Sequence, residues 1–153
     1  MTGVTGDRIA SDAVTSHRAR LVRSGGTRLP AVAVPEAAGV AVGDRIRLVL
    51  DGSVRHARVE RGGDGPVVRG AYDTGGDLAV IDGRDDSVSP ADVPNRLVEW
   101  CRDHDRKRGD AVALDEIDAG FHYGLRAPGE RAVYGILGRP DRGLQDIARD
   151  LDG

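Results

Sequence analysis

Gly43-Asp44-Arg45-Ile46-Arg47-Leu48-Val49-Leu50 is the segment from which the expected architecture follows, because a related segment occurs a second time. The second copy, Gly109-Asp110-Ala111-Val112-Ala113-Leu114-Asp115-Glu116, begins 66 residues further along the chain. Both copies continue to a histidine at the same offset, His56 in the first and His122 in the second. After each Gly-Asp pair apolar residues recur at every second position, a pattern typical of strands with one buried face. We therefore predict two Gly-Asp turns, each followed by a strand, a tight connection and a returning strand.

The residues around these strands carry turn and helix signals. Asp51-Gly52 is a two-residue hairpin signal between a strand at residues 45–50 and a strand at residues 54–59. Asn95 is expected to cap a helix that leads into the second Gly-Asp turn. An amphipathic C-terminal helix is indicated by the spacing of Leu144, Ile147, Ala148 and Leu151. Further strands are predicted at residues 17–23, 28–34, 67–72, 112–117, 121–126 and 132–137.

The expected fold is mainly β with a few short helices, arranged as a pseudo-symmetric antiparallel β-barrel, or pseudobarrel. Closing the strands into a barrel removes the exposed edges that short strands would otherwise leave. The barrel is placed at residues 17–138, with halves at about 17–72 and 95–138 and an acidic surface insertion, containing at most one short strand, at 73–94. A flexible N-terminal arm is expected at residues 1–16 and the C-terminal helix at 139–153.

Length and composition favour a soluble cytoplasmic protein. The 153 residues contain no apolar run of the roughly eighteen residues that a membrane helix needs. The N-terminal residues lack the apolar stretch of a secretory signal. Cys101 is the single cysteine, which excludes an internal disulfide and fits a reducing compartment. We therefore expect neither a membrane partner nor export.

The kinds of charged residue indicate a salt-adapted protein. Of the 22 basic residues 21 are Arg, and of the 25 acidic residues 20 are Asp. Short carboxylates with almost no lysine are similar to the surfaces of proteins from halophilic archaea, where carboxylates keep the chain hydrated. The alternative is a GC-rich genome, whose codons favour Arg, Ala, Gly and Asp.

Basic residues are concentrated in the first half of the chain. Residues 17–72 contain ten Arg and five acidic residues, whereas residues 73–95 contain six Asp and only one Arg. A basic half in a chain of net charge -3 indicates an anionic partner, for which DNA or RNA is the simplest candidate. The alternative is that these Arg side chains only line the solvent faces of strands.

Short motifs in the chain resemble known DNA-binding families. The segments Leu21-Val22-Arg23-Ser24-Gly25-Gly26-Thr27-Arg28-Leu29-Pro30, Val34-Pro35-Glu36 and Val42-Gly43-Asp44-Arg45-Ile46-Arg47-Leu48 are similar to AbrB-type transcription-factor and antitoxin domains. In those domains a strand, a Pro-led helical turn and a Gly-Asp hairpin build half of a swapped-hairpin barrel. Taken over both halves, the chain resembles the DNA-binding pseudobarrel of plant B-three-type transcription factors and restriction-enzyme effector domains. The whole chain also resembles an uncharacterised haloarchaeal family, from which no function carries over.

The pseudobarrel resemblance implies where nucleic acid would bind. The family's recognition arms correspond to the turn at residues 23–28 and to the strand pair at about residues 55–69. Arg side chains there suit phosphate contacts and bidentate reading of guanine. The chain departs from that family in its few aromatic residues and in its acidic insertion. The implied nucleic-acid-binding residues are Arg23, Arg28, Arg55, Arg58 and Arg69.

Motifs for catalysis or cofactor binding are missing from the sequence. It has no Walker loop, Rossmann fingerprint or GxSxG elbow, and Gly62-Gly63-Asp64-Gly65 lacks the Lys and the following helix of a phosphate loop. We therefore expect no enzyme activity, no cofactor and no metal. Gly43 and Gly109 are expected to adopt unusual backbone angles, Cys101 to be a small buried hydrophobe, and Asp115, Glu116 and Asp118 to form a solvated acidic rim, with a divalent-ion site as the less favoured alternative.

We predict a small cytosolic nucleic-acid-binding protein, most simply a DNA-binding regulator, that uses an Arg-rich face of the first half. In molar salt, counterion release would contribute little affinity, so binding there would depend on base contacts. The alternative is a protein-interaction module or accessory subunit that docks a protein partner through its C-terminal helix and binds no nucleic acid. A small-molecule enzyme on the same barrel is a third interpretation, for which the sequence offers no catalytic constellation.

Overall fold

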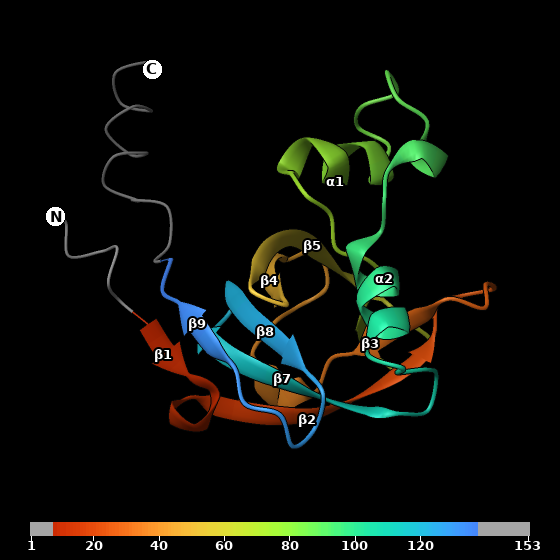
Figure 1. Cartoon of the computed structure of the whole chain (residues 1–153). Coiled ribbons are helices and arrows are strands. Elements are labelled where there is room, and N and C mark those ends of the chain that lie inside the picture. The colour runs from red at the N-terminus through yellow and green to blue at the C-terminus, as the bar shows by residue number, and fades with distance from the viewer. Residues whose placement is uncertain (1–7, 138–153) are drawn as a thin grey trace, which may run out of the picture.

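The computed structural model describes residues 8–137, and its centre is a closed barrel of seven strands (Figure 1). The strands follow the order β2-β3-β6-β5-β4-β8-β7 around the barrel, which confirms the mainly-β barrel. Two further strands pair with each other in a separate small sheet, β1 (Arg8–Ala10) and β9 (Val133–Gly135). The barrel strands are β2 (Thr15–Arg23), β3 (Pro30–Ala33), β4 (Arg45–Leu50), β5 (Ser53–Arg61), β6 (Pro66–Val68), β7 (Ala111–Asp118) and β8 (His122–Arg126).

One pair of strands runs parallel, so the predicted antiparallel barrel is in fact mixed, although most of its strand pairs are antiparallel. β4 and β8 are parallel, with Arg47 opposite His122 and Leu50 opposite Leu125. The other six pairs in the barrel are antiparallel. The reason is the way the ring closes, because β4 and β8 belong to two different hairpins, β4–β5 and β7–β8, that meet through these strands.

Alternating side chains fill the barrel. In β4, Ile46, Leu48 and Leu50 are buried in the core, whereas Arg45 and Arg47 lie on the outer face. The helix α2 (Arg96–Asp103) packs against the same core with its buried residues Leu97, Trp100 and Cys101. Asn95 caps this helix through its side chain, as the sequence predicts.

Both Gly-Asp turns have the expected local geometry. The φ angle is 99° at Gly43 and 94° at Gly109, in the left-handed region that glycine adopts at little cost. The carboxylate of Asp44 accepts a hydrogen bond from the Ala41 N–H, and that of Asp110 accepts one from the Lys107 N–H, each at 2.9 Å. The two predicted Gly-Asp turns are therefore confirmed.

Residues 8–16 belong to the predicted N-terminal arm but form regular structure. Instead of an arm up to residue 16, the chain forms β1, a 3-10 turn η2 (Ser11–Ala13) and the start of β2. The pairing of β1 with β9 holds this segment against the end of the described chain (Figure 1). The predicted C-terminal helix at residues 139–153 lies outside the described residues.

The acidic insertion contains helix rather than strand. Its apolar run at residues 78–81 belongs to α1 (Gly75–Ile81), whose N-cap Thr74 accepts a hydrogen bond from the Asp77 N–H. A 3-10 turn, η4 (Pro90–Asp92), follows, and another, η3 (Glu36–Ala38), forms the predicted Pro-led turn before β4. Across residues 8–137, no helix has both the length and the apolar character needed to cross a membrane.

Candidate nucleic-acid interface

The acidic insertion neutralises part of the predicted basic face. Asp82, which follows α1, has carboxylate oxygens 3.4 Å from Nη2 of Arg45 and 3.3 Å from Nε of Arg58. Arg45 and Arg58 are directly opposed on β4 and β5, so Asp82 offsets the repulsion between two like charges. The Asp82 side chain is only 3% exposed, so its carboxylate is directed at this pair of arginines rather than at solvent.

A second carboxylate of the insertion, Asp73, holds Arg55 and Arg96. Arg96 donates to Asp73 from Nη2 at 2.7 Å and from Nε at 2.9 Å, and Arg55 donates to it from Nη1. The hydrogen bonds from Arg96 are the main reason that the pKa of Asp73 lies below its usual value. Two of the five predicted contact residues, Arg55 and Arg58, are thus committed to carboxylates of the same chain.

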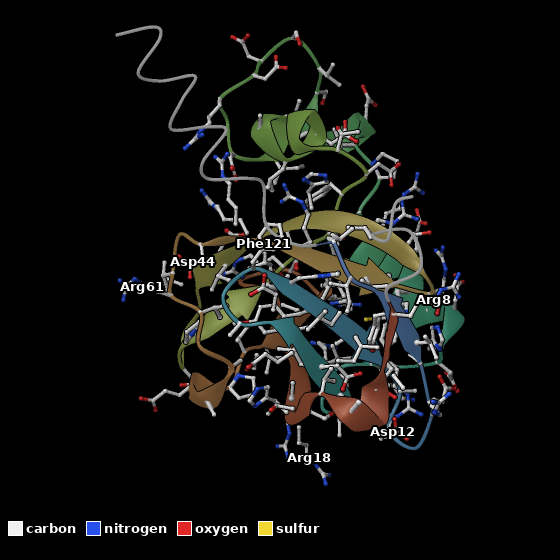
Figure 2. The ribbon with its side chains drawn as sticks, turned by 90° about the vertical axis from the view of Figure 1, so that its left-hand side faces the viewer. Arg8, Asp12, Arg18, Asp44, Arg61 and Phe121 are labelled. Carbon is white, nitrogen blue, oxygen red and sulfur yellow. The ribbon has the colours of Figure 1, made fainter. Side chains whose placement is uncertain are left out.

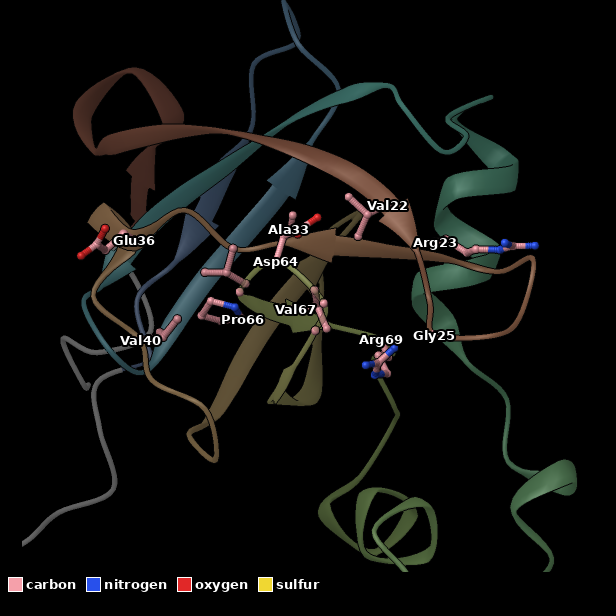
Figure 3. Close-up of a pocket in the computed structure, with 14 residues that line it drawn as sticks. Val22, Arg23, Gly25, Ala33, Glu36, Val40, Asp64, Pro66, Val67 and Arg69 are labelled. Carbon is pink, nitrogen blue, oxygen red and sulfur yellow. The ribbon is translucent and has the colours of Figure 1, made fainter.

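A groove of about 610 Å³ lies over the outer face of β2, β3 and β6 (Figure 3). Its floor is apolar, with Val22 from β2, Ala33 from β3 and Val67 from β6. Ala33 and Val67 are neighbours in the sheet, so the floor is continuous. The glycine-rich turn at residues 62–65 lines the groove as well. Arg69 lies at one end and Glu36 at the other (Figure 3).

The guanidinium of Arg69 is held in place by three neighbours. It donates from Nη2 to the carbonyl of Arg61 at 2.9 Å and from Nη1 to the hydroxyl of Ser24 at 3.4 Å. Its Nε lies 3.6 Å from a carboxylate oxygen of Glu60. The Arg69 side chain is nevertheless 28% exposed, so it can still reach an external anion. Because its position is already fixed, binding would cost little further ordering.

Arg23 and Arg28 lie near the same end of the groove. Arg23 lines the groove, and its Nε donates to the carbonyl of Thr27 at 3.0 Å. Arg28 is exposed in the same connection between β2 and β3. A Cβ on Gly25 in this connection would lie 3.3 Å from Nη1 of Arg69, which shows how close the connection approaches that side chain. The fold therefore brings together three of the five predicted residues.

Three exposed arginines outside the predicted set extend this basic surface. Arg18 and Arg20 lie on the outer face of β2, and Arg61 ends β5 beside the turn at residues 62–65. Among residues 8–137 these three side chains form no ion pair or hydrogen bond. Figure 2 shows Arg18 and Arg61 pointing away from the molecule. The sequence indicates that Arg18 and Arg20 are exposed, since they alternate with core residues of β2. We define the groove rim as the arginines in and around the groove: Arg18, Arg20, Arg23, Arg28, Arg61 and Arg69.

The two histidines of the repeat flank one arginine. Arg47 on β4 is opposite His56 on β5 and opposite His122 on β8, so the three side chains form a row on the outer face. The Arg47 guanidinium lies 5.3 Å from the centre of the Phe121 ring. His122 is 1% exposed, and in residues 8–137 neither ring nitrogen has a hydrogen-bond partner. This row is better suited to packing than to binding a metal.

Burial of His122 predicts a loss of stability in mild acid. Burial is the main cause that lowers the pKa of His122 below 6.5. The charge of Asp118 raises this pKa, and the charge of Arg47 lowers it. The unfolded chain then binds more protons than the folded chain as the pH falls below about 6.5. We expect the free energy of unfolding to decrease from pH 7 to pH 5 and to change less in His122→Leu. Urea titrations at fixed salt measure this, and equal pH dependence in both proteins would refute it.

Other side chains of chemical interest are structural. Burial raises the pKa of the Cys101 thiol to about 11, so it is not a thiolate at neutral pH. Asp115 is fully buried and receives hydrogen bonds from Arg126 and Tyr134, so the predicted solvated rim is wrong at this residue. Glu116 lies 2.9 Å from His17. In the described part of the chain, no three His, Cys, Asp or Glu side chains converge as a metal site requires.

The chain belongs to a family of unknown function, DUF7112, whose sequence profile matches residues 5–151. No curated protein and no solved structure matches the chain significantly. The family assignment is consistent with the resemblance to an uncharacterised family and does not supply a function.

Proposed function

We propose that this DUF7112 protein binds nucleic acid through the groove rim. The observation that carries the proposal is the division of the arginines into two groups. Arg45, Arg55 and Arg58 face carboxylates of the insertion, whereas Arg18, Arg20, Arg28 and Arg61 keep unpaired, exposed guanidinium groups within residues 8–137. Several unpaired arginines beside one groove favour a polyanion over a single small anion, since phosphates repeat along a nucleic-acid strand.

The proposal keeps the finer predictions from the sequence. It includes a pseudo-two-fold barrel of the AbrB and B-three type, a regulatory role on DNA and a cytoplasmic, salt-adapted archaeal setting. The contact set differs from the one that the pseudobarrel resemblance implies. Arg55 and Arg58 are replaced by Arg18, Arg20 and Arg61, because the first two are engaged by Asp73 and Asp82.

Removing two rim charges should weaken binding strongly. We expect Arg20→Ala/Arg61→Ala to lower the affinity for nucleic acid about 10- to 100-fold, since two exposed contacts of roughly 0.5–1.5 kcal/mol each are lost and about 1.4 kcal/mol corresponds to a factor of ten. Fluorescence anisotropy with labelled duplex DNA, single-stranded DNA and single-stranded RNA measures the affinity. The titrations start at low KCl and extend to molar KCl, with folding checked by circular dichroism at each salt.

The control removes the same charge from another part of the surface. Arg8 lies on the side of the molecule opposite Arg61 (Figure 2), and Arg131 precedes β9. Arg8→Ala/Arg131→Ala should therefore retain affinity within about twofold of the wild type. Equal losses in the two double variants would indicate a response to net charge alone and would contradict a defined interface. Absence of binding to all three polymers by folded protein would favour the protein-interaction alternative.

A further inference from the structure

We infer that the groove holds one unstacked nucleotide, so that the protein prefers single-stranded nucleic acid or an unpaired nucleotide to continuous duplex. This inference rests on the proposed function and specifies its ligand. The groove combines an apolar floor, arginines at one end and carboxylates elsewhere along its lining. A nucleotide is complementary to this arrangement. Its anionic phosphate suits the arginines, its flat base suits the apolar floor, and the hydrogen-bond donors at the edge of the base suit the carboxylates.

The apolar floor is the feature that a duplex cannot use. Val22, Ala33 and Val67 form the bottom of a concavity, while Arg20, which pairs with Ala33, lies beside it on the outer face of β2. In a duplex the faces of the bases are covered by stacking, and only their edges are accessible in the grooves. A base must leave the stack before its face can pack on this floor.

The charges at the two ends set the direction of the nucleotide. Arg69 and Arg23 line one end and would bind the phosphate, which places the base over the floor. Glu36 lies at the opposite end, and the carboxylate of Asp64 also lines the groove. Carboxylates accept hydrogen bonds from amino groups such as N4 of cytosine. No Phe, Tyr or Trp lines the groove, so the base would pack on aliphatic side chains rather than on an aromatic ring.

The volume is sufficient for such a ligand. Small-molecule sites typically occupy about 300–1,000 Å³, and the groove of about 610 Å³ lies within this range. Arg18, Arg20, Arg28 and Arg61 of the rim do not line the groove, so they would bind neighbouring phosphates of a strand outside it while one base is inside. The rim would supply affinity for the backbone, and the groove would supply the preference for unpaired bases.

Filling the groove tests this inference. Ala33→Phe places a large side chain on the floor at a strand position where aromatic residues are well tolerated. We expect the variant to bind a single-stranded oligonucleotide about tenfold more weakly than the wild type, while duplex affinity changes by less than twofold. Ala91→Phe, at an exposed position of η4, is the matched control and should bind both as the wild type does. Thermal unfolding of both variants establishes that they are folded.

An oligonucleotide of abasic nucleotides distinguishes the contribution of the bases to affinity from that of the sugar-phosphate backbone. It carries the same phosphates, so the wild type should bind it more weakly than the normal strand, and Ala33→Phe should cause no further loss. Equal binding of normal, abasic and duplex ligands, with the loss in Arg20→Ala/Arg61→Ala intact, would overturn the groove inference and leave the rim interface standing. The groove inference would also be overturned if Ala33→Phe bound the single-stranded oligonucleotide as tightly as the wild type does. Absence of binding to every ligand would reject the proposed function itself.

Discussion

Asp115→Asn should lower the free energy of unfolding by about 3–5 kcal/mol, the range measured when one partner of a buried ion pair is removed. Asp115 is fully buried on β7 and accepts hydrogen bonds from Arg126 Nε at 2.7 Å and from the Tyr134 hydroxyl at 2.5 Å. This contact raises the pKa of Arg126 and ties β9 to the outside of β7 and β8. Urea or guanidinium titrations monitored by circular dichroism measure the loss.

The control for this substitution is an exposed pair in the same region. Asp12 and Arg131 lie 3.7 Å apart, and their side chains are 73% and 63% exposed. Solvated pairs of this kind contribute about 0–1 kcal/mol, so Asp12→Asn should have almost no effect. If Asp115→Asn were as mild as Asp12→Asn, the buried network would not be the contact that holds β9 on the barrel.

Asn95→Ala should lower the free energy of unfolding by about 2–4 kcal/mol. The side-chain oxygen accepts hydrogen bonds from the N–H groups of Ala71, Leu97 and Val98, and the amide nitrogen donates to the carbonyl of Arg69 at 3.1 Å. An N-cap residue contributes roughly 0.5–2 kcal/mol, and each buried polar group left unpaired costs about 1–3 kcal/mol. The same titrations measure the change.

Asn95→Asp distinguishes the two roles of this side chain. The carboxylate still caps α2 but cannot donate to Arg69, so the loss of stability should be about half of that in Asn95→Ala. Because the lost bond holds the backbone of Arg69, both variants should also weaken nucleic-acid binding where the protein is folded. Equal stability of Asn95→Ala and the wild type would show that the cap contributes little to the junction between β6 and α2.

Local sequence signals predicted the turns and the strands between them. Asp51 and Gly52 have φ angles of 51° and 85°, as the two-residue hairpin requires, and β4 has its predicted bounds. The parallel pair of β4 and β8 could not be predicted, because it depends on how two distant hairpins meet. Helix propensity does not predict α1, because Gly75 and Gly76 are poor helix formers; the local signal for this helix is its N-cap, Thr74.

The candidate interface was predictable only in part. Charge counts locate the arginines in the first half, but they do not show which carboxylate faces which arginine. Asp82 follows Arg45 by 37 residues and Arg58 by 24. These contacts form only when α1 packs beside β4 and β5, which local sequence patterns do not reveal. The groove likewise forms from β2, β3 and β6 and from the turn at residues 62–65, which only the closed barrel brings together.

The salt dependence of binding tests the rim interface most directly. For duplex DNA, the slope of log K against log salt falls by about 0.9 for each phosphate contact, and for single strands by about 0.7. If Arg20 and Arg61 each contact a phosphate, the slope of Arg20→Ala/Arg61→Ala should be smaller in magnitude by about 1.4–1.8 than that of the wild type. Arg8→Ala/Arg131→Ala should keep the wild-type slope. Identical slopes in all three folded proteins would contradict the claim that the groove rim binds the nucleic-acid backbone.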